Sequence, residues 1–485
     1  MAFPILAVVI AAIFRAVPVL IAWPYPVGYD TTTAYIIQMV RPIPSLYFVF
    51  SQQGLHAVIL SAVYDVYPHP FVILDAFAVA AQALLALEIY AYSRKVAGLD
   101  AGLSFLVAMI FTFNLLTMRL LWDQYRMDLG LIFVLAIFLA LSSKEVPIRW
   151  FALPLIFLVV ISNAEPTVFV VLTLLVFSVA KLRMNLNSLK GDPAFLTAIL
   201  GIALFALQLE LMSSAQSYVP LYQISSIGGN DQGINGLIFL VYAAWPMLIL
   251  FPFAFRRKLE YHTIWFFVVL AFAVGIPATG LGITKEPTDW LYWMMNFPLA
   301  VVFAQALRRK SSDQREKLAG GANTGSTQTD RLFKRAAAAL IAFLVISSAA
   351  YAVSSPLLPS PYSLFAISYA SDMPTGYLQS TVPISEEGEL MALLNSTLST
   401  LPRNSILYLG EQFYGLSLLF PNPNSINLIF IGRISSDANL SRLSDASAGY
   451  TIWWTTPNGW YGVSEIPPGF VTISQRGPFS LYKTG

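Results

Sequence analysis

Long apolar stretches separated by polar segments run through the first 353 residues of the chain. A membrane-spanning helix needs about 20 mostly apolar residues to cross a hydrocarbon core of about 30 Å. Two of the stretches, 129–142 and 151–163, are short for a full crossing and need flanking residues or a thin bilayer. The pattern predicts about eleven transmembrane helices, at 4–23, 70–92, 101–118, 129–142, 151–163, 166–181, 194–212, 236–255, 262–281, 291–307 and 336–353.

Two regions have a different pattern. Within the long first loop, 24–69, the stretch "IPSLYFVFSQQGLHAVILSAVY" is too polar to span but apolar enough to lie at the interface, which indicates a re-entrant or surface-lying helix pair. Residues 354–485 alternate short apolar runs ("SILYLG", "INLIFIG", "GYTIWW") with turn residues and end in a hairpin pattern around Arg476 and Gly477. We therefore predict a polytopic α-helical membrane domain over 1–353, followed by a small α/β domain over 354–485.

Composition supports the membrane assignment and excludes several kinds of chemistry. Hydrophobic residues make up 57% of the chain and charged residues 11%, and the mean hydropathy is +0.66. The first stretch has no basic leader and no small-residue cleavage site, so we expect it to be retained. The absence of cysteine excludes disulfides, thiolate nucleophiles and cysteine-ligated metals, and the 3 histidines lack the spacing of a zinc site. A net charge of +2 does not indicate a nucleic-acid partner.

The distribution of basic residues predicts the orientation in the membrane. With a cytoplasmic N-terminus, the inner loops carry most of the Lys and Arg side chains, as the positive-inside rule requires. The polar, basic and low-complexity segment 308–335 is then expected to be a flexible cytoplasmic loop. An odd number of spans puts 354–485 outside the cytoplasm, together with glycosylation sequons at Asn395 and Asn439.

The first candidate for chemistry is Asp30, in the stretch "WPYPVGYDTTTAY" directly after the first span. Ionisable groups beside the bilayer are costly and suggest function. Gly28 allows the backbone to turn and the two prolines stiffen the approach, so the carboxylate can be held in one direction. The alternative is that Asp30 is only the N-cap of a following helix, and both roles stay open.

Arg15 lies about two turns below the outer end of the first span. Its guanidinium is suited to hold a lipid phosphate through two hydrogen bonds. The alternative is a buried ion pair with a neighbouring helix, for example with Glu165. Glu165 itself precedes Pro166 at a tight turn, where it is either a charge at a helix start or part of an acidic site.

The second outer loop contains "MRLLWDQYRMDLG". Arg119, Asp123 and Arg126 are spaced i, i+4 and i+7, so they share one face if a single helix continues through them, which would make a salt-bridge ladder. Asp128 lies outside that ladder and is the better second functional carboxylate.

The fifth outer loop contains the aromatic stretch "EPTDWLYWMMNFP". Trp290 and Tyr292 fit an interfacial aromatic belt. They also fit the wall of a sugar site, together with Tyr29, with Lys285 close to a phosphate.

With these residues in view, the chain resembles the GT-C glycosyltransferases, polytopic enzymes that take a sugar from a polyprenyl-phosphate carrier. The resemblance rests on "FRAVP", "PVGYDTTTAY" and "WDQYRMDLG", and on a bundle of about eleven spans followed by an extracytoplasmic domain. It is closest to archaeal relatives of the dolichyl-phosphate-mannose protein mannosyltransferases. The family role of the first-loop acid, general base for the acceptor hydroxyl, would fall on Asp30.

The resemblance implies transfer of a hexose from a polyprenyl (dolichyl) phosphate to a protein hydroxyl or a lipid-linked glycan. The leaving phosphate needs a positive site. The candidate groups are Arg15, Arg126, Arg119 and Lys285 for the phosphate, Asp128 and Glu165 as further acids, and Trp290, Tyr292 and Tyr29 for the sugar. The chemistry requires no cofactor, and a divalent metal, if one binds, would use Asp123 and Asp128.

Two departures from related families narrow the prediction. Protein mannosyltransferases usually have an Asp-Glu pair where this chain has Asp30 and Thr31. Oligosaccharyltransferases carry an acid after paired tryptophans, whereas this chain has "WWTTPNG" at 453–459, which disfavours oligosaccharyl transfer and a strict metal requirement. The alternatives are a lipid transporter or flippase, an oligosaccharyltransferase-like enzyme and an inactive scaffold relative. The first is disfavoured because no inverted repeat is visible.

Overall fold

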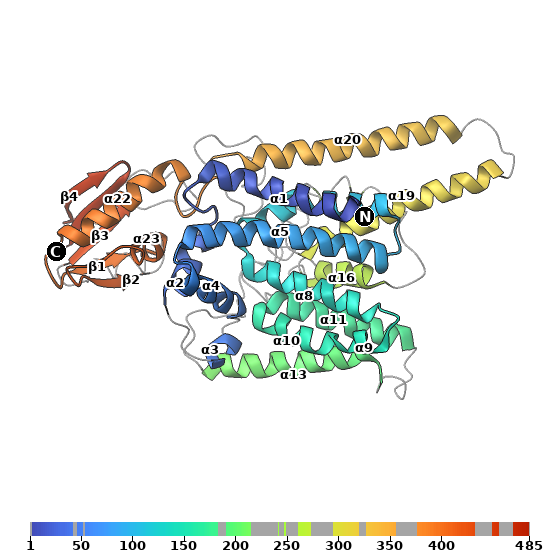
Figure 1. Cartoon of the computed structure of the whole chain (residues 1–485), viewed down its shortest axis with the longest axis horizontal. Helices are drawn as coiled ribbons and strands as arrows, with labels where there is room; N and C mark the ends of the chain where they lie inside the picture. The colour runs from blue at the N-terminus through green and yellow to red at the C-terminus, as the bar shows by residue number, and fades with distance from the viewer. Residues whose placement is uncertain are drawn as a thin grey trace.

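The protein is a helical bundle with a mixed β-sheet at one end (Figure 1). The computed structural model describes residues 2–41, 46–51, 54–182, 191–214, 241, 247–248, 260–272, 294–319, 326–355, 376–431, 449–454 and 469–484. Most of the predicted span 236–255, and the loop with Lys285, Trp290 and Tyr292, lie outside these residues.

Among the described residues, three helices are long and apolar enough to cross a membrane: α1 (Ala2–Ala22), α5 (Pro70–Lys95) and the Pro193–Leu211 part of α13 (Pro193–Ser214). Helix α5 begins with proline, whose missing N–H costs nothing at a helix start, and it ends with two basic residues that favour the negative end of the helix dipole. The protein is a polytopic helical membrane protein.

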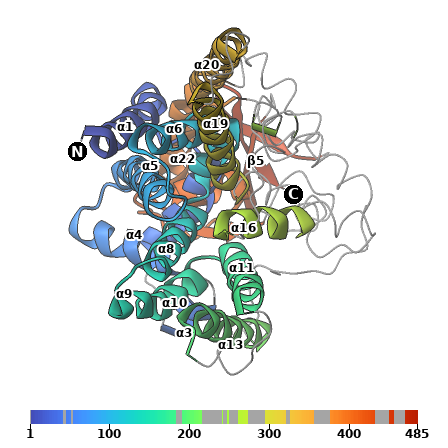
Figure 2. The same ribbon diagram turned by 90° about the vertical axis from the view of Figure 1, so that its right-hand side faces the viewer.

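The other predicted spans also correspond to helices in the described part of the chain. These are α6 (Ala101–Thr112), α8 (Tyr125–Leu141), α9 (Val146–Trp150) with α10 (Ala152–Ser162), α11 (Ala164–Leu182), α16 (Tyr261–Leu270), α19 (Asn296–Ala319) and α20 (Ser326–Ala352). Helix α8 contacts both α5 and α10, and Figure 2 shows it between the group α1, α5 and α6 and the group α10, α11 and α13.

One expectation about the bundle is wrong. The stretch 101–118 is not one helix, because α6 ends at Thr112 and α7 (Leu115–Asp123) starts anew. The Asn114 carbonyl accepts the first hydrogen bonds of α7, and asparagine favours such helix starts over helix interiors. Helix α19 continues to Ala319 and α20 begins at Ser326, so helices extend into the segment 308–335, whose flexibility stays a prediction (Figure 1).

The first loop is helical, as its composition predicts. It contains the π-helix η1 (Thr31–Tyr35), α2 (Ile36–Val40), α3 (Leu46–Ser51) and α4 (Leu55–Val66). Hydrogen bonds from α13 and to α13 hold α3 in place, since the Gln208 side-chain amide donates to the Phe50 carbonyl (2.7 Å) and the Tyr47 hydroxyl donates to the Leu211 carbonyl (2.7 Å).

The C-terminal residues form a five-stranded sheet in the order β2-β1-β3-β5-β4. The predicted apolar runs are β1 (Ile406–Leu409), β2 (Asn427–Phe430) and β3 (Gly449–Trp454), and the predicted hairpin is β4 (Val471–Arg476) with β5 (Phe479–Thr484). Strand β1 is parallel to β2 and β3, and β5 is antiparallel to β3 and β4. Helices α22 (Ile384–Thr400) and α23 (Glu411–Ser417) accompany the sheet.

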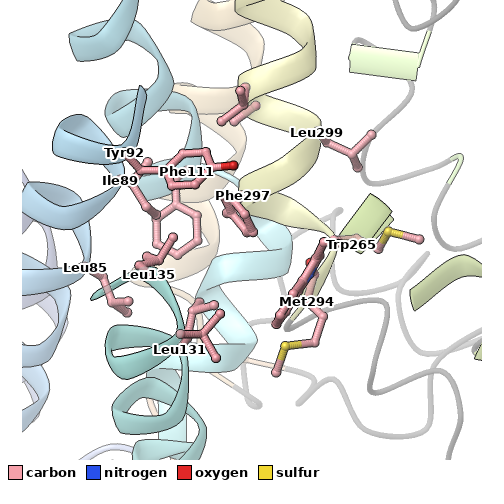
Figure 3. Close-up of a cluster of buried hydrophobic side chains, with 14 of the residues drawn as sticks. Leu85, Ile89, Tyr92, Phe111, Leu131, Leu135, Trp265, Met294, Phe297 and Leu299 are labelled. Atoms are coloured by element: carbon pink, nitrogen blue, oxygen red, sulfur yellow. The ribbon is translucent and has the colours of Figure 1, made fainter. Parts of the chain in front are cut away.

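Two large hydrophobic cores explain how the parts hold together. The first fills the bundle and includes aromatic and aliphatic side chains of α5, α6, α8, α16 and α19 (Figure 3). The second contains sheet residues such as Trp453 together with Tyr35 and Ile36 of the first loop, Leu74 of α5 and Tyr125 of α8. The C-terminal sheet unit therefore packs directly on the first loop and on the adjacent end of the bundle.

Candidate active site

The loop that carries Asp30 is fixed immediately before the residue. Gly28 has a φ of +116°, a conformation that side chains rarely adopt, and its N–H donates to the Gln379 carbonyl (2.9 Å). Asp30 itself precedes η1 and is half-buried. Its side chain makes no capping hydrogen bond, so the N-cap alternative has no support.

Asp123, the last residue of α7, contacts this loop. Its Oδ2 accepts the backbone N–H groups of Tyr29 (3.2 Å) and Asp30 (3.4 Å). Its Oδ1 accepts the side-chain N–H of Gln124 (3.1 Å). The expected ladder on one continuous helix is wrong, because Gln124 separates α7 from α8 and Arg126 belongs to the second of these helices.

Arg126 interacts electrostatically with the carboxylates of Asp30 and Glu165. All three side chains are half-buried. They come from three separate elements: the first loop, the first turn of α8 and the first turn of α11, where the Glu165 N–H donates to the Asn163 side-chain oxygen (3.1 Å). We name Asp30, Arg126 and Glu165 the Arg126 centre.

Two stacked tyrosines lie beside the Arg126 centre. The rings of Tyr35 and Tyr125 have centroids 5.0 Å apart and an interplanar angle of 15°. The Tyr35 hydroxyl donates to the Asp123 carbonyl (2.6 Å) and accepts the Tyr125 N–H (3.1 Å). Burial, followed by the nearby Asp30 carboxylate, raises the pKa of Tyr35 well above its ordinary value, so the hydroxyl remains a neutral donor.

A second arginine lies deeper and is more enclosed. Arg15 is only 2% exposed, and none of its guanidinium nitrogens has a hydrogen-bond partner of normal geometry. It interacts electrostatically with the buried acids Asp75 of α5 and Asp128 of α8, and it lies 5.5 Å from the centre of the Tyr377 ring. Arg15, Asp75 and Asp128 form what we name the Arg15 centre. The alternative pairing of Arg15 with Glu165 is wrong, since Glu165 is next to Arg126.

The geometry of these two centres can now be set against known proteins. No protein-family model matches the sequence, and no curated protein matches it significantly. The chain is similar in structure to ArnT from Cupriavidus metallidurans, crystallised bound to undecaprenyl phosphate, with 12% identity and a TM-score of 0.54. The similarity covers 99% of this chain and 97% of that one. The chain has the GT-C fold.

Within this GT-C fold, the C-terminal unit also reaches the Arg15 centre. Glu387, in the first turn of α22, is fully buried and interacts electrostatically with Asp75. Its Oε2 accepts a hydrogen bond from the Ser380 hydroxyl (3.1 Å). Burial raises the pKa of Glu387 to about 8 although the Ser380 hydrogen bond opposes the shift, so the side chain is mostly neutral at pH 7.

Several residues in or beside the two centres were absent from the sequence prediction. Asp75 stands alone in the apolar run "PFVILDAFAV", and an acid within a span is a signal that identifies it as a candidate. Glu387 in "SEEGEL" looks like an ordinary acid at a helix start, so its sequence context gives no signal. Tyr35 and Tyr125 join the site only through the approach of the first loop to α8.

Other predicted residues are distributed differently. The Tyr29 ring is buried in the bundle core, so the loop is contacted through its backbone. Arg119 lies in α7, and its side chain is outside the described residues, as are Lys285, Trp290 and Tyr292. Within the described ranges, no cluster of three or more acidic or histidine side chains is arranged to hold a metal ion.

Proposed function

We propose that the protein is a membrane glycosyltransferase that transfers a sugar from a polyprenyl-phosphate carrier to an acceptor hydroxyl. The Arg126 centre carries this proposal, because it offers a half-buried carboxylate beside a half-buried cation at one end of the bundle. The fold supports it, since the same architecture occurs over nearly the whole chain in a protein crystallised with undecaprenyl phosphate. The basic loops favour the extracytoplasmic side for this end.

The proposed reaction is a direct displacement at the anomeric carbon. Asp30 accepts the proton of the acceptor hydroxyl while that oxygen forms a bond to the anomeric carbon. The bond from the anomeric carbon to the phosphate oxygen breaks, and polyprenyl phosphate leaves with its negative charge. A single displacement inverts the anomeric configuration.

Arg126 is a cation that interacts with the proposed base, and we assign it to the leaving phosphate, whose charge grows in the transition state. Glu165 interacts with the same guanidinium and would orient it. Asp128 and Arg15, which are closed off in the structure, we assign to support of the site and not to direct contact with the phosphate.

The remaining assignments extend the sequence resemblance. We propose a hexose as the sugar, a dolichyl-type phosphate as the carrier and a protein hydroxyl or lipid-linked glycan as the acceptor. Arg119 and Lys285 remain predicted phosphate contacts, and Trp290 and Tyr292 remain predicted contacts of the sugar. No cofactor is part of the proposed chemistry.

The decisive variant is Asp30→Asn, because it removes the base and keeps the shape of the side chain. Purified protein in nanodiscs would be supplied with polyprenyl-phosphate mannose and with hydroxyl-bearing peptides or lipid-linked glycans, and free polyprenyl phosphate would be measured. We expect the variant to lose turnover by at least about 100-fold while its thermal unfolding stays unchanged. Asp65→Asn, an exposed acid of the same loop, is the matched control and should keep full turnover.

Near-normal turnover of Asp30→Asn would remove Asp30 from the mechanism. A different outcome is that the unaltered protein moves the intact lipid-linked sugar across a vesicle membrane without releasing polyprenyl phosphate. That result would identify it as a flippase and contradict the proposed transferase activity.

A further inference from the structure

We infer that Asp123 is a positioning residue that holds the Asp30 loop in its reactive arrangement. This inference rests on the proposed function of Asp30. Asp123 belongs to another element, the end of α7, and it is 94 and 93 positions along the chain from the two residues whose backbone it contacts.

The contacts are directional and enclosed. Asp123 is 1% exposed, and its Oδ2 accepts two consecutive backbone N–H groups, those of Tyr29 and of Asp30 itself. Hydrogen bonds from N–H groups to an ionised carboxylate are about twice as strong as those between neutral groups. Two adjacent N–H groups on one oxygen fix the rotation of the peptide unit that leads into Asp30, and therefore the direction in which its side chain leaves the backbone.

Neighbouring contacts restrict the same segment from both sides. The Gly28 N–H donates to the Gln379 carbonyl (2.9 Å), and the Trp122 indole N–H donates to the Tyr377 carbonyl (3.0 Å). A methyl group at Gly28 would collide with the Trp122 carbonyl oxygen. Asp123 is the member of this set whose side chain bonds directly to the Asp30 backbone.

Both carboxylate oxygens of Asp123 accept hydrogen bonds. Oδ1 of Asp123 accepts the Gln124 side-chain N–H, so N–H donors occupy both carboxylate oxygens. The Asp123 carbonyl accepts the Tyr35 hydroxyl, which ties the end of α7 to the first loop a second time. In this role the side chain acts on the reaction through Asp30.

A base must come within about 3 Å of the proton that it removes, and a displacement of about 1 Å can cost about 100-fold in rate. We therefore expect Asp123→Ala to lower kcat about 100-fold while KM for polyprenyl-phosphate mannose changes less than about threefold. Asp123→Asn keeps one acceptor oxygen, so it should recover about tenfold of that loss.

Asp100→Ala is the matched control, since the Asp100 carboxylate accepts a backbone N–H in the same way, from Leu103 (2.9 Å), at the start of α6. This variant should lower the thermal unfolding temperature and leave the kcat of the folded protein unchanged. A drop in kcat equal to that of Asp123→Ala would show a general effect of lost stability and overturn the inference.

Hydrogen exchange of the peptide covering residues 24–35 gives a readout that does not need activity. In both Asp123 variants the amide hydrogens of this peptide should exchange faster, whereas the exchange rates in the strands of the C-terminal sheet should stay unchanged. If Asp123→Ala does not fold, the Asp123→Asn measurements decide alone. Unchanged exchange, an unchanged kcat or an effect on KM alone overturns the positioning role, whereas absence of turnover in the unaltered protein overturns the proposed function and leaves the exchange result valid.

Discussion

The two arginine centres have the same set of charged groups, one guanidinium and two carboxyl groups, and differ in exposure to solvent. In each, one guanidinium interacts with two carboxylates: Arg126 with Asp30 and Glu165, and Arg15 with Asp75 and Asp128. The first three side chains are half-buried, and the other three are at most 5% exposed. Of the two centres, the Arg126 centre is therefore the more open to solvent. Exposure, and not the set of residue types, therefore separates a candidate catalytic site from a buried electrostatic tie.

The Arg15 centre connects α1, α5 and α8. Buried charges are costly unless opposite charges and hydrogen bonds compensate them, and both oxygens of Asp128 lack a hydrogen-bond partner. The arginine therefore provides the main favourable interaction of the two acids. Its loss should lower the stability of the folded protein more than it lowers turnover.

The largest effect is expected at Arg15. Arg15→Met leaves two buried acids without their cation and should destabilise the folded protein by about 3–5 kcal/mol. Thermal unfolding in detergent and the yield of folded protein would measure this. Combining Arg15→Met with Asp75→Asn and Asp128→Asn removes all three charges and should restore much of the stability. If Arg15→Met alone is as stable as the unaltered protein, the stabilising role of the Arg15 centre is contradicted.

Arg126 should show the opposite profile. Arg126→Gln removes the positive group that we assign to the leaving phosphate, so kcat should fall by about 100- to 1,000-fold, as when an enzyme loses one transition-state contact. The unfolding temperature should change by less than about 3 °C because the side chain is half-buried. Arg126→Lys keeps the charge without the planar fork and should recover only part of the rate. A large loss of stability with normal kcat would show that Arg126, like Arg15, stabilises the fold and has no role in the reaction.

The smallest effect is expected at Glu387 and depends on pH. Its raised pKa of about 8 means that the folded state keeps the proton where the unfolded chain has lost it. The stabilising contribution is therefore complete below about pH 4.5, declines as the pH rises, and is lost above about pH 8. Glu387→Gln should match the unaltered protein at pH 5 and unfold a few degrees higher at pH 8.5.

The exposed Glu389 lies on the same helix, so Glu389→Gln is the control and should follow the unaltered protein at both pH values. A Glu387→Gln profile parallel to that of the unaltered protein would show that this carboxyl does not titrate between them.

Sequence reasoning succeeded where periodicity and local chemistry determine structure. The long apolar runs became helices, and the hairpin at Arg476 and Gly477 formed because its turn residues fit only a tight reversal. Asp30 was identifiable because a carboxylate directly after a span is rare. The sequence did not show which acid lies beside which arginine. The helix break at Gln124 redirects Arg126, and it is accompanied by a long-range hydrogen bond from the Tyr125 N–H to the Tyr35 hydroxyl.

A close approach between the C-terminal unit and the first loop limits how the protein can be divided. Gly415 of α23 lies so near the Thr32 carbonyl of η1 that a β-carbon would collide with it. The C-terminal sheet unit therefore packs closely against the residues that follow Asp30 and restricts their conformation. A fragment ending after α20 would retain every charged group of both centres and lack the surface that shapes them, so the smallest fragment with the proposed activity is expected to include the residues after α20.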